Sequence, residues 1–258
     1  MKGTVFAQIG YLGRRSLRRT LRQPAAAVPA ILFPLLFLGL MNGAAGPAAN
    51  IPGFPAPTYL HFLLGGLLIQ GVVFGGINAG TDLAVDIEDG FLERLSLTPV
   101  RRIALLLGQA AGSLAIGTVV ISVLMGAAML GGVEIRTGFP GMLVMLGLSL
   151  ITSLAFSGFG FTLALRTGSS EAVQSSFPLF FIIITFTSFF MPREFIDVAW
   201  FRTVATYNPA TYLMEAMREL IINGWDVFAI GRAYAISAGM AVIALAIASR
   251  LLKVRLAR

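Results

Sequence analysis

TDLAVDIEDGFLERLSLTPVRR, residues 81–102, is the most charged part of a chain that is otherwise mostly apolar. Long apolar segments flank it on both sides. A charged residue at the centre of a bilayer costs roughly 2.5–3.5 kcal/mol on insertion scales, so a helix with this many charges cannot span one. We therefore expect the segment outside the hydrocarbon, tethered to two membrane helices and available to a soluble partner. Its charged residues are Asp82, Asp86, Glu88, Asp89, Glu93, Arg94, Arg101 and Arg102.

The composition of the whole chain indicates an integral membrane protein. Of its 258 residues, 57% are hydrophobic and 12% are charged, whereas a soluble domain carries about 25% charged residues. The absence of cysteine and the single histidine, His61, exclude disulfides, thiolate metal sites and multi-histidine metal sites. The net charge is +7, and in a membrane protein an arginine excess reports topology, so no nucleic-acid partner is expected.

Hydropathy predicts one all-α transmembrane domain over residues 1–258, with six spans. An even number of spans puts both termini on one side of the membrane. That side gathers fourteen of the 19 Lys and Arg residues, and the other side gathers five. The positive-inside rule therefore places both termini and residues 82–102 in the cytoplasm, and residues 192–227 outside. The predicted spans cover residues 25–45, 58–80, 103–130, 139–165, 172–191 and 228–252.

Residues 4–22 predict an amphipathic helix that lies in the membrane interface. At about 100° per residue, five arginines fall in one sector, and apolar side chains such as Phe6 and Leu17 fall on the opposite side. This pattern is typical of a helix beside anionic headgroups. The alternative is a simple positive-inside anchor. The five arginines are Arg14, Arg15, Arg18, Arg19 and Arg22.

Residues 192–227 are too polar to cross a bilayer and contain the signals of a short helix. Asn208 is a favoured N-cap and Pro209 a favoured first helical residue. Asn223-Gly224 is a C-cap pair, so we predict a helix over 209–222. Such a helix lies in the interface, or dips into the membrane and returns. It could serve as a lid at the outer mouth or as an interfacial anchor, and the sequence leaves both open.

The chain lacks an energy source of its own. No predicted span carries an ionisable residue at depth, which argues against a gradient-driven transporter. A P-loop needs a lysine after glycine, and the only lysines, Lys2 and Lys253, do not fit. No nucleophile–base–acid set indicates an enzyme. An aquaporin-like channel would need a second Asn-Pro, and none occurs besides Asn208-Pro209. Chemical energy must therefore come from another chain.

Three segments, in this order and at this length, carry a resemblance to a known family. They are residues 17–40 (LRRTLRQPAAAVPAILFPLLFLGL), 88–109 (EDGFLERLSLTPVRRIALLLGQ) and 207–220 (YNPATYLMEAMREL). The chain resembles the permease subunit of type-2 ATP-binding-cassette transporters, and within these the daunorubicin-resistance type of exporter. One departure lies at residues 86–91. Many members have Glu-x-x-x-Gly-Thr there, whereas this chain has Asp86 at the first position and Phe91 at the last.

The resemblance implies a permease dimer, formed with a second copy or a homologue, above two cytoplasmic ATPase subunits that bind ATP and Mg. The chain itself would hold no cofactor and no catalytic residue, and it would sit in a bacterial or archaeal cytoplasmic membrane. By analogy, residues 82–100 are the coupling helix, which seats in the ATPase through Asp86, Glu88, Gly90, Phe91, Glu93, Arg94, Leu97, Pro99 and Arg101. The outer gate would include Asn208, Pro209, Tyr212, Glu215, Arg218 and Glu219.

The expected substrate is an amphipathic drug or a lipid, because aromatic walls suit such ligands. By analogy the path lies at the dimer interface, along the first, second and fifth spans. A polysaccharide or teichoic-acid exporter of the same fold is an alternative, and so is a scaffold or sensor subunit that transports nothing. The path residues that we expect are Phe33, Phe37, Gln70, Phe74, Asn78, Phe177 and Phe181.

Overall fold

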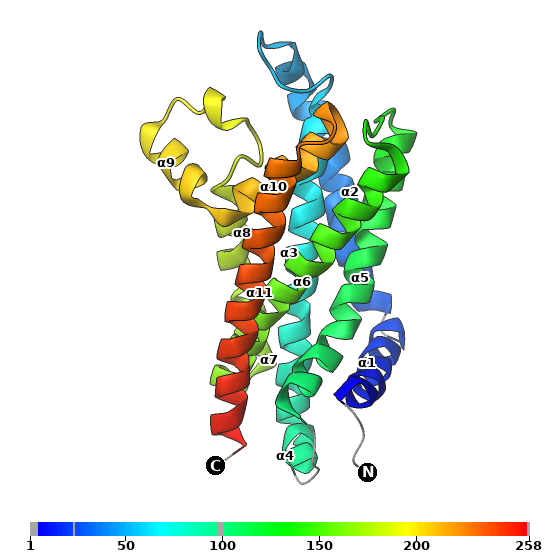
Figure 1. Ribbon diagram of the computed structural model, residues 1–258, viewed down its shortest axis with the longest axis vertical. Helices are drawn as coiled ribbons and strands as arrows, with labels where there is room; N and C mark the ends of the chain where they lie inside the picture. Colours follow the sequence, from blue (N-terminus) through cyan, green and yellow to red (C-terminus); the bar gives the residue numbers. More distant parts are fainter. Residues whose placement is uncertain (1–4, 23, 97–100, 257–258) are drawn as a thin grey trace.

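The computed structural model describes residues 5–22, 24–96 and 101–256, and the regular structure of these residues is entirely helical. The long helices form an elongated bundle (Figure 1). α1, α4 and the end of α11 lie at one end, which we call the terminal end, and α9 and α10 lie toward the opposite, far end. The elements are α1 (Val5–Arg22), α2 (Pro24–Ala45), η1 (Gly46–Asn50), α3 (Tyr59–Glu88), α4 (Phe91–Ser96), α5 (Arg102–Leu130), α6 (Gly138–Thr167), α7 (Ser170–Ser175), α8 (Phe177–Thr185), η2 (Arg193–Phe195), α9 (Ala199–Tyr207), α10 (Pro209–Arg218), η3 (Glu219–Asn223) and α11 (Val227–Arg255).

Among the described residues, five helices are long and apolar enough to cross a membrane, namely α2, α3, α5, α6 and α11. They correspond to the predicted first, second, third, fourth and sixth spans. α3 lies at the centre, where it contacts α2, α5, α6, α7 and α10. In its most apolar stretch 94% of the residues are buried, whereas in that of Ile31–Asn50, at the side of the bundle, only 11% are. In lipid, the exposed apolar face of α2 has either acyl chains or another protein as its neighbour.

Glycines set how closely the central helices approach. A Cβ added to Gly80 of α3 would lie 2.5 Å from the carbonyl carbon of Gly160 in α6. Small residues at such crossings allow backbones to touch in lipid, where burial of apolar side chains gives no advantage over lipid contact. At Gly43 of α2, by contrast, an added Cβ would meet nothing within 4 Å. α2 is therefore not held to the bundle by a close backbone approach at this position.

The predicted fifth span, residues 172–191, is not one continuous helix. Its helical part is α7 and α8, which together span Ser170–Thr185 and are shorter than the five long helices, and residues 186–191 are not helical. Pro178 lies in the first turn of α8, where a missing N–H leaves no helical hydrogen bond unmade. In one continuous helix with α7, the same missing N–H would remove a hydrogen bond, so Pro178 favours a new helix start here. Hydropathy detected the apolar character of the segment, but it could not detect where the helix ends.

The charged segment is also not the single helix predicted over 82–100. Asp82, Asp86 and Glu88 belong to α3, which runs past the expected end at residue 80. The chain then turns at Gly90, whose φ of +66° favours glycine, and α4 follows. Arg94 of α4 donates hydrogen bonds to the Asp89 carbonyl at 2.9 Å and the Gly90 carbonyl at 3.3 Å. The second membrane helix and the first part of the charged segment, up to Glu88, therefore form one continuous helix, and a short turn and α4 follow it.

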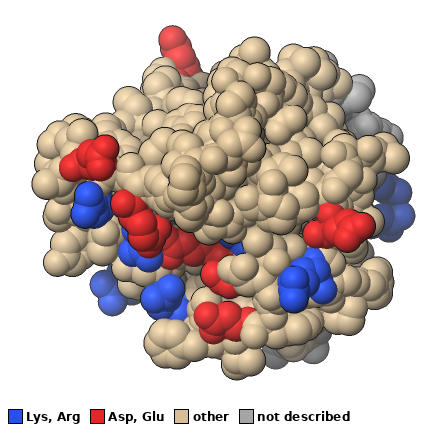
Figure 2. All heavy atoms as spheres, turned by 90° about the horizontal axis from the view of Figure 1, so that it is seen from above, with Lys and Arg blue, Asp and Glu red and all other residues tan. Residues whose placement is uncertain are grey.

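The far end carries the predicted helix after Asn208, here α10, continued by a wider π-helical turn, Glu219–Asn223. The chain leaves this turn at Gly224, with a φ of +120°. Seen from above, acidic and basic side chains are interspersed over a largely uncharged surface (Figure 2). This end therefore shows no extended patch of a single charge sign in this view.

Candidate functional site

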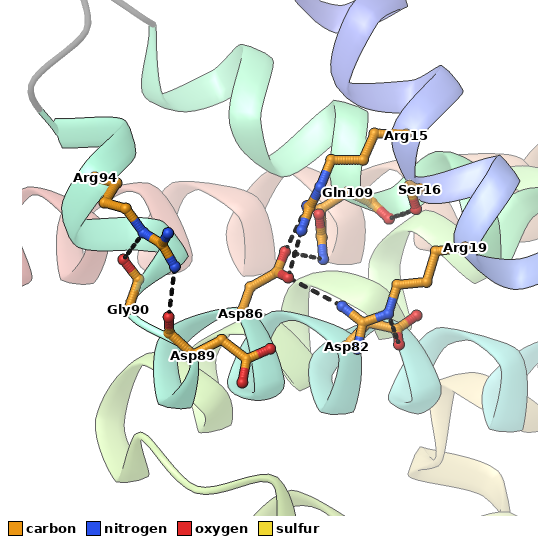
Figure 3. Close-up of polar contacts among 9 residues, drawn as sticks. All are labelled: Arg15, Ser16, Arg19, Asp82, Asp86, Asp89, Gly90, Arg94 and Gln109. Carbon is orange, nitrogen blue, oxygen red and sulfur yellow. Dashed lines mark hydrogen bonds and ion pairs between the residues drawn. The ribbon is translucent and has the colours of Figure 1, made fainter.

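Asp86 is the centre of a buried polar cluster at the terminal end (Figure 3). Its side chain lies near the end of α3, and the residue is 3% exposed. Oδ2 accepts from Arg15 Nη1 at 2.8 Å and from Gln109 Nε2 at 3.1 Å. Oδ1 accepts from Arg15 Nη2 at 2.8 Å and from Arg19 Nη1 at 3.0 Å. A buried carboxylate is tolerated only when it is paired and hydrogen-bonded, and these four bonds meet that requirement.

The two arginines reach Asp86 because α1 is docked on α5 through small residues. Ser16 Oγ donates to the Gln109 carbonyl at 2.9 Å and accepts from the Gly112 N–H at 3.1 Å. A Cβ added to Gly108 would lie 2.4 Å from the Leu12 Cβ, so this approach requires glycine. α1 therefore uses two of its five predicted headgroup-facing arginines to bind the protein instead.

Arg15 connects α1 to α3 and α4 at once. Besides its bidentate bond to Asp86, its guanidinium carbon lies 3.8 Å from the centre of the Phe91 ring, a cation–π geometry. The hydrogen bond with Asp86 raises the pKa of Arg15. Asp86 and Phe91 are the two positions where the sequence departs from the family pattern, and both contact the same guanidinium. Their roles are thus linked by Arg15, a contact that the sequence did not indicate.

Two further contacts join the terminal end of α3 and α5 to neighbouring elements. The Glu88 carboxylate accepts from the Ser170 N–H at 2.6 Å and from the Ser170 hydroxyl at 3.0 Å, which ties the end of α3 to the start of α7. The Arg101 N–H donates to Gln8 Oε1 at 3.0 Å, which ties α1 to the start of α5. Movement of the turn between α3 and α5 would therefore also move α1 and α7.

The remaining residues predicted for the interfacial helix and for coupling fall into two groups. Arg14 and Arg18 are exposed on α1 and make no hydrogen bond or ion pair within the part of the chain that the structure describes. Leu97 and Pro99, together with the side chains of Glu93 and Arg22, lie outside the described residues, so their predicted roles stay predictions.

At the far end, Arg218, one of the predicted gate residues, is buried in the bundle. Only 6% of it is exposed. Its Nε donates to the Phe62 carbonyl at 2.8 Å, its Nη1 to Ser188 Oγ at 3.0 Å and its Nη2 to the Phe189 carbonyl at 3.0 Å. The guanidinium carbon lies 3.6 Å from the centre of the Phe62 ring. Arg218 thus fixes α10 to α3 and to the chain that follows α8, because a buried cation needs hydrogen-bond acceptors around it and these acceptors come from both segments.

Glu215 and Tyr212 lie on the same helix and contact basic side chains from other elements. Arg193 Nε lies 2.7 Å from Glu215 Oε1, and the guanidinium carbon of Arg232 lies 4.4 Å from the Tyr212 ring centre. Burial raises the pKa of Glu215, although Arg193 opposes this effect. Glu219 accepts a hydrogen bond from Asn223 at 2.9 Å within its own turn. The predicted gate residues are therefore joined to α11 and to the 186–198 segment rather than arranged on a free surface.

Asn208 caps two helices with one side chain. Its Oδ1 accepts from the Ala210 N–H at 3.0 Å, which confirms the predicted N-cap of α10. Its Nδ2 donates to the carbonyls of Ile183 and Phe186, at 2.8 and 3.0 Å. These carbonyls lie at the end of α8, where no further helical turn supplies their donors. Asn208 therefore makes it possible for α8 to end early and for α10 to begin beside it.

The predicted path residues from α2, α3 and α8 meet in one aromatic cluster. Phe74 of α3 lies 4.2 Å from Phe177 and 6.3 Å from Phe181, both of α8, measured between ring centres. It also lies 6.3 Å from Phe33 of α2, whose ring is 5.8 Å from that of Phe37. The two amide residues sit differently, because Gln70 is buried in the core, with no partner for its Oε1 among the described residues, and Asn78 is half-buried.

Sequence reasoning missed the partners that complete these sites. Gln109 and Ser16 complete the Asp86 cluster, Ser170 binds Glu88, and Arg193 binds Glu215. Arg15 and Asp86 are 71 positions apart, so no local pattern pairs them. One signal was available in the sequence. Residues 4–22 carry an excess of arginines and residues 81–102 an excess of carboxylates, and because the two segments flank the first two membrane helices, they can lie at the same end.

These features define a helical integral membrane protein whose charged clusters lie at the ends of its bundle. Residues 7–222 match the model of the ABC-2 type transporter family, and the chain belongs to that family. This confirms the resemblance drawn from the three sequence segments, and with it the class of protein: a membrane permease of the ATP-binding-cassette type.

Three relatives cover most of the chain, each about a quarter identical to it. The daunorubicin resistance ABC transporter permease protein DrrB1 of Streptomyces coeruleorubidus is 25% identical over 224 residues, 85% of this chain and 77% of that protein. The probable doxorubicin resistance ABC transporter permease protein DrrC of Mycobacterium tuberculosis is 25% identical over 211 residues, covering 81% and 75%. The putative transport permease ycf38 of Porphyra purpurea is 25% identical over 272 positions, covering 98% and 91%.

Proposed function

We propose that this chain is the transmembrane subunit of an ATP-driven exporter that moves an amphipathic drug or lipid-like substrate out of the cytoplasm or the inner leaflet. Two separate ATPase subunits would bind ATP and Mg and supply the energy, and two permeases would pair to form the path. The terminal end would face the cytoplasm of a bacterial or archaeal cell, and residues 170–191 would complete a sixth crossing. Family membership and the drug-resistance names of two relatives support this proposal.

One observation carries the ATPase coupling: Arg15 joins α1, α3 and α4 at the end of the bundle that holds the charged segment. A force applied to α4 would act on Phe91, and through the Arg15 guanidinium on Asp86 and the central helix. Because α3 is a single helix from its far-end start to Glu88, displacement at one end tilts the whole rod. The short α4 is therefore suited to be the coupling helix, and α1 holds it in place against α3 through Arg15.

The Glu88–Ser170 contact extends this path to α7 and α8. α7 leads directly into α8, which carries Phe177 and Phe181 of the aromatic cluster. A tilt of α3 would pull on α7 through the carboxylate and shift α8 against Phe74. The same motion that begins at α4 would thus change the aromatic surface that α2, α3 and α8 share. At the far end, Arg218 and Asn208 would transmit the shift of α8 to α10, the proposed outer gate.

The aromatic cluster supports an amphipathic substrate. Phe33 is 44% exposed on the side of the bundle where α2 is least buried, so its ring is available to a ligand or a second permease. Flat aromatic surfaces stack well with the planar rings of many drugs. Stretches of polar side chains, which a sugar polymer would need, are not found along the described faces of α2 and α8.

The direct test is ATP hydrolysis by the permease–ATPase complex in proteoliposomes. An amphipathic drug such as doxorubicin should stimulate hydrolysis, and Phe33→Ala should weaken that stimulation. Stimulation by a lipid-linked glycan instead of the drug would identify a polysaccharide or teichoic-acid exporter and overturn the proposed substrate. If no ATPase copurifies, or hydrolysis responds to no substrate, the chain is a scaffold or sensor subunit and the exporter proposal fails.

A second test addresses the coupling segment alone. Glu93→Ala combined with Arg94→Ala should lower drug-stimulated hydrolysis while the permease stays folded, because both side chains belong to α4. Arg250→Ala, an exposed change on α11 at the same end of the bundle, should leave hydrolysis unchanged. Equal hydrolysis in the double variant and the parent would contradict the coupling role of α4.

A further inference from the structure

A basic recess lies between α1 and the end of α3. We use this name for a hollow of about 780 Å³ lined by four arginines, two aspartates and a tyrosine. The four cations against two carboxylates leave the lining with two positive charges in excess. Figure 3 shows two of the arginines reaching across to α3. The lining residues are Tyr11, Arg14, Arg15, Arg18, Arg19, Asp86 and Asp89.

The four arginines are not equivalent. Arg15 and Arg19 are already bound to the Asp86 carboxylate. Arg14 and Arg18 have no hydrogen bond or ion pair within the described part of the chain, and both are exposed. They are four residues apart on α1, so their side chains are neighbours on one face of the helix. The excess charge of the recess is therefore carried by two adjacent guanidiniums whose donors have no partner among the described residues.

An exposed apolar edge runs along α1 next to these free arginines. Phe6 is 85% exposed and Leu17 is 36% exposed. At about 100° per residue, Arg14 falls between Arg18 and Leu17, so the edge and the basic recess adjoin on the same helix. An apolar edge of this kind needs acyl chains beside it, whereas the adjoining guanidiniums need an anion. One molecule of matching chemistry has both: a phospholipid with a negatively charged headgroup.

We propose that the basic recess binds the phosphate of an anionic phospholipid, with Arg14 and Arg18 as its ligands and the acyl chains against the edge formed by Phe6 and Leu17. The bound lipid fixes the rotation of α1 from the side that faces the lipid, as Asp86 fixes it from the side that faces the protein. An acidic segment of a partner protein could also neutralise the recess, but it would leave the adjoining apolar edge without acyl chains, which is why the lipid is favoured.

Native mass spectrometry of the full-length permease, offered equal amounts of phosphatidylglycerol and phosphatidylcholine, tests the site. The parent protein should retain phosphatidylglycerol preferentially. R14Q combined with R18Q should lower this preference roughly 30-fold, because each basic side chain at a membrane surface contributes about fivefold to the affinity for an anionic lipid. The matched control is R250Q with K253Q, which removes two exposed cations from the end of α11, at the same end of the bundle, and should change nothing. Ser16→Cys adds a thiol that is buried while α1 is docked, so slow labelling of this thiol by a maleimide shows that the variant remains folded.

Three results would overturn the proposal. The first is an equal loss of preference in both double variants, which would show a general charge effect. The second is displacement of the lipid by excess inorganic phosphate, which would show that the acyl chains contribute nothing and that the ligand is free phosphate. The third is loss of the lipid when the ATPase binds, which would show that the recess docks a protein. Binding of the ATPase with the lipid retained would leave both this site and the proposed function in place.

Discussion

Asp86→Ala should release α1 from the bundle without unfolding the rest of the chain. Breaking a buried ion pair by removing one partner costs about 3–5 kcal/mol, mostly because the remaining charge is left buried. Here the remaining charges are not deeply buried, since the side chains of Arg15 and Arg19 are 38% and 23% exposed and can turn to water. We therefore expect the lower limit, about 3 kcal/mol, which shifts the docked-to-undocked equilibrium of α1 roughly 100-fold.

The assay uses the absence of native cysteine in this chain. Ser16→Cys places one thiol at a position that is 4% exposed while α1 is docked on α5. A water-soluble maleimide can then react only when α1 moves away, so the labelling rate follows the undocked population. Adding Asp86→Ala to this background should raise the labelling rate by roughly 100-fold, as expected from the same free energy.

Asp89→Ala is the matched control. It removes the same charge three residues further along, but Asp89 is exposed and its side chain forms no salt bridge among the described residues. Its labelling rate should stay close to that of the parent, because Asp89 attracts Arg15 through space and does not bond to it. If Asp86→Ala labels no faster than Asp89→Ala, the Asp86 cluster does not hold α1, and the coupling path drawn through Arg15 is refuted.

Three further predictions address the other contacts. Glu88→Ala should lower drug-stimulated ATP hydrolysis while costing less than about 1 kcal/mol of stability, because its bond to α7 is exposed; Glu171→Ala on α7 is the control, and an equal fall in both would argue against the tether. Asn208→Asp keeps the cap of α10 but loses both donors to α8, so thermal unfolding should show a loss of about 2–4 kcal/mol; parental stability would contradict the double cap. Gly80→Ala should destabilise the permease by about 1–3 kcal/mol through overpacking, and Gly43→Ala should be tolerated; similar unfolding of the two would refute the close α3–α6 approach.

Local signals in the sequence located most of the helices. The apolar runs predicted α2, α5, α6 and α11 within a few residues, because desolvation acts on each residue wherever it lies. The cap of α10 was also predictable, since Asn208-Pro209 satisfies the first turn of a helix through its own side chain and ring. The family followed from three short segments, and its model match confirmed it.

Features that depend on residues distant in the chain could not be predicted from the sequence. The fifth span was predicted as one crossing from its apolar length, but α8 ends early because Asn208, far along the chain, supplies donors to its last carbonyls. Arg218 was predicted only as a gate residue, and its burial depends on the Phe62 and Phe189 carbonyls, which no local pattern indicates. In each case the deciding group lies on another element, and a polar group can be buried only where such a partner is brought to it.

By itself the sequence determined that this is an integral membrane protein, that no predicted span carries an ionisable residue at depth, and that the chain carries no P-loop. These properties are sums over residues or short patterns, so they do not depend on how the chain is folded. Only the tertiary structure decided that Arg15 binds Asp86 and stacks on Phe91, and that Arg14 and Arg18 line a recess beside an apolar edge without a partner among the described residues. Hydrogen bonds and ion pairs act over a few ångströms, and which groups come that close is set by helix packing rather than by order along the chain.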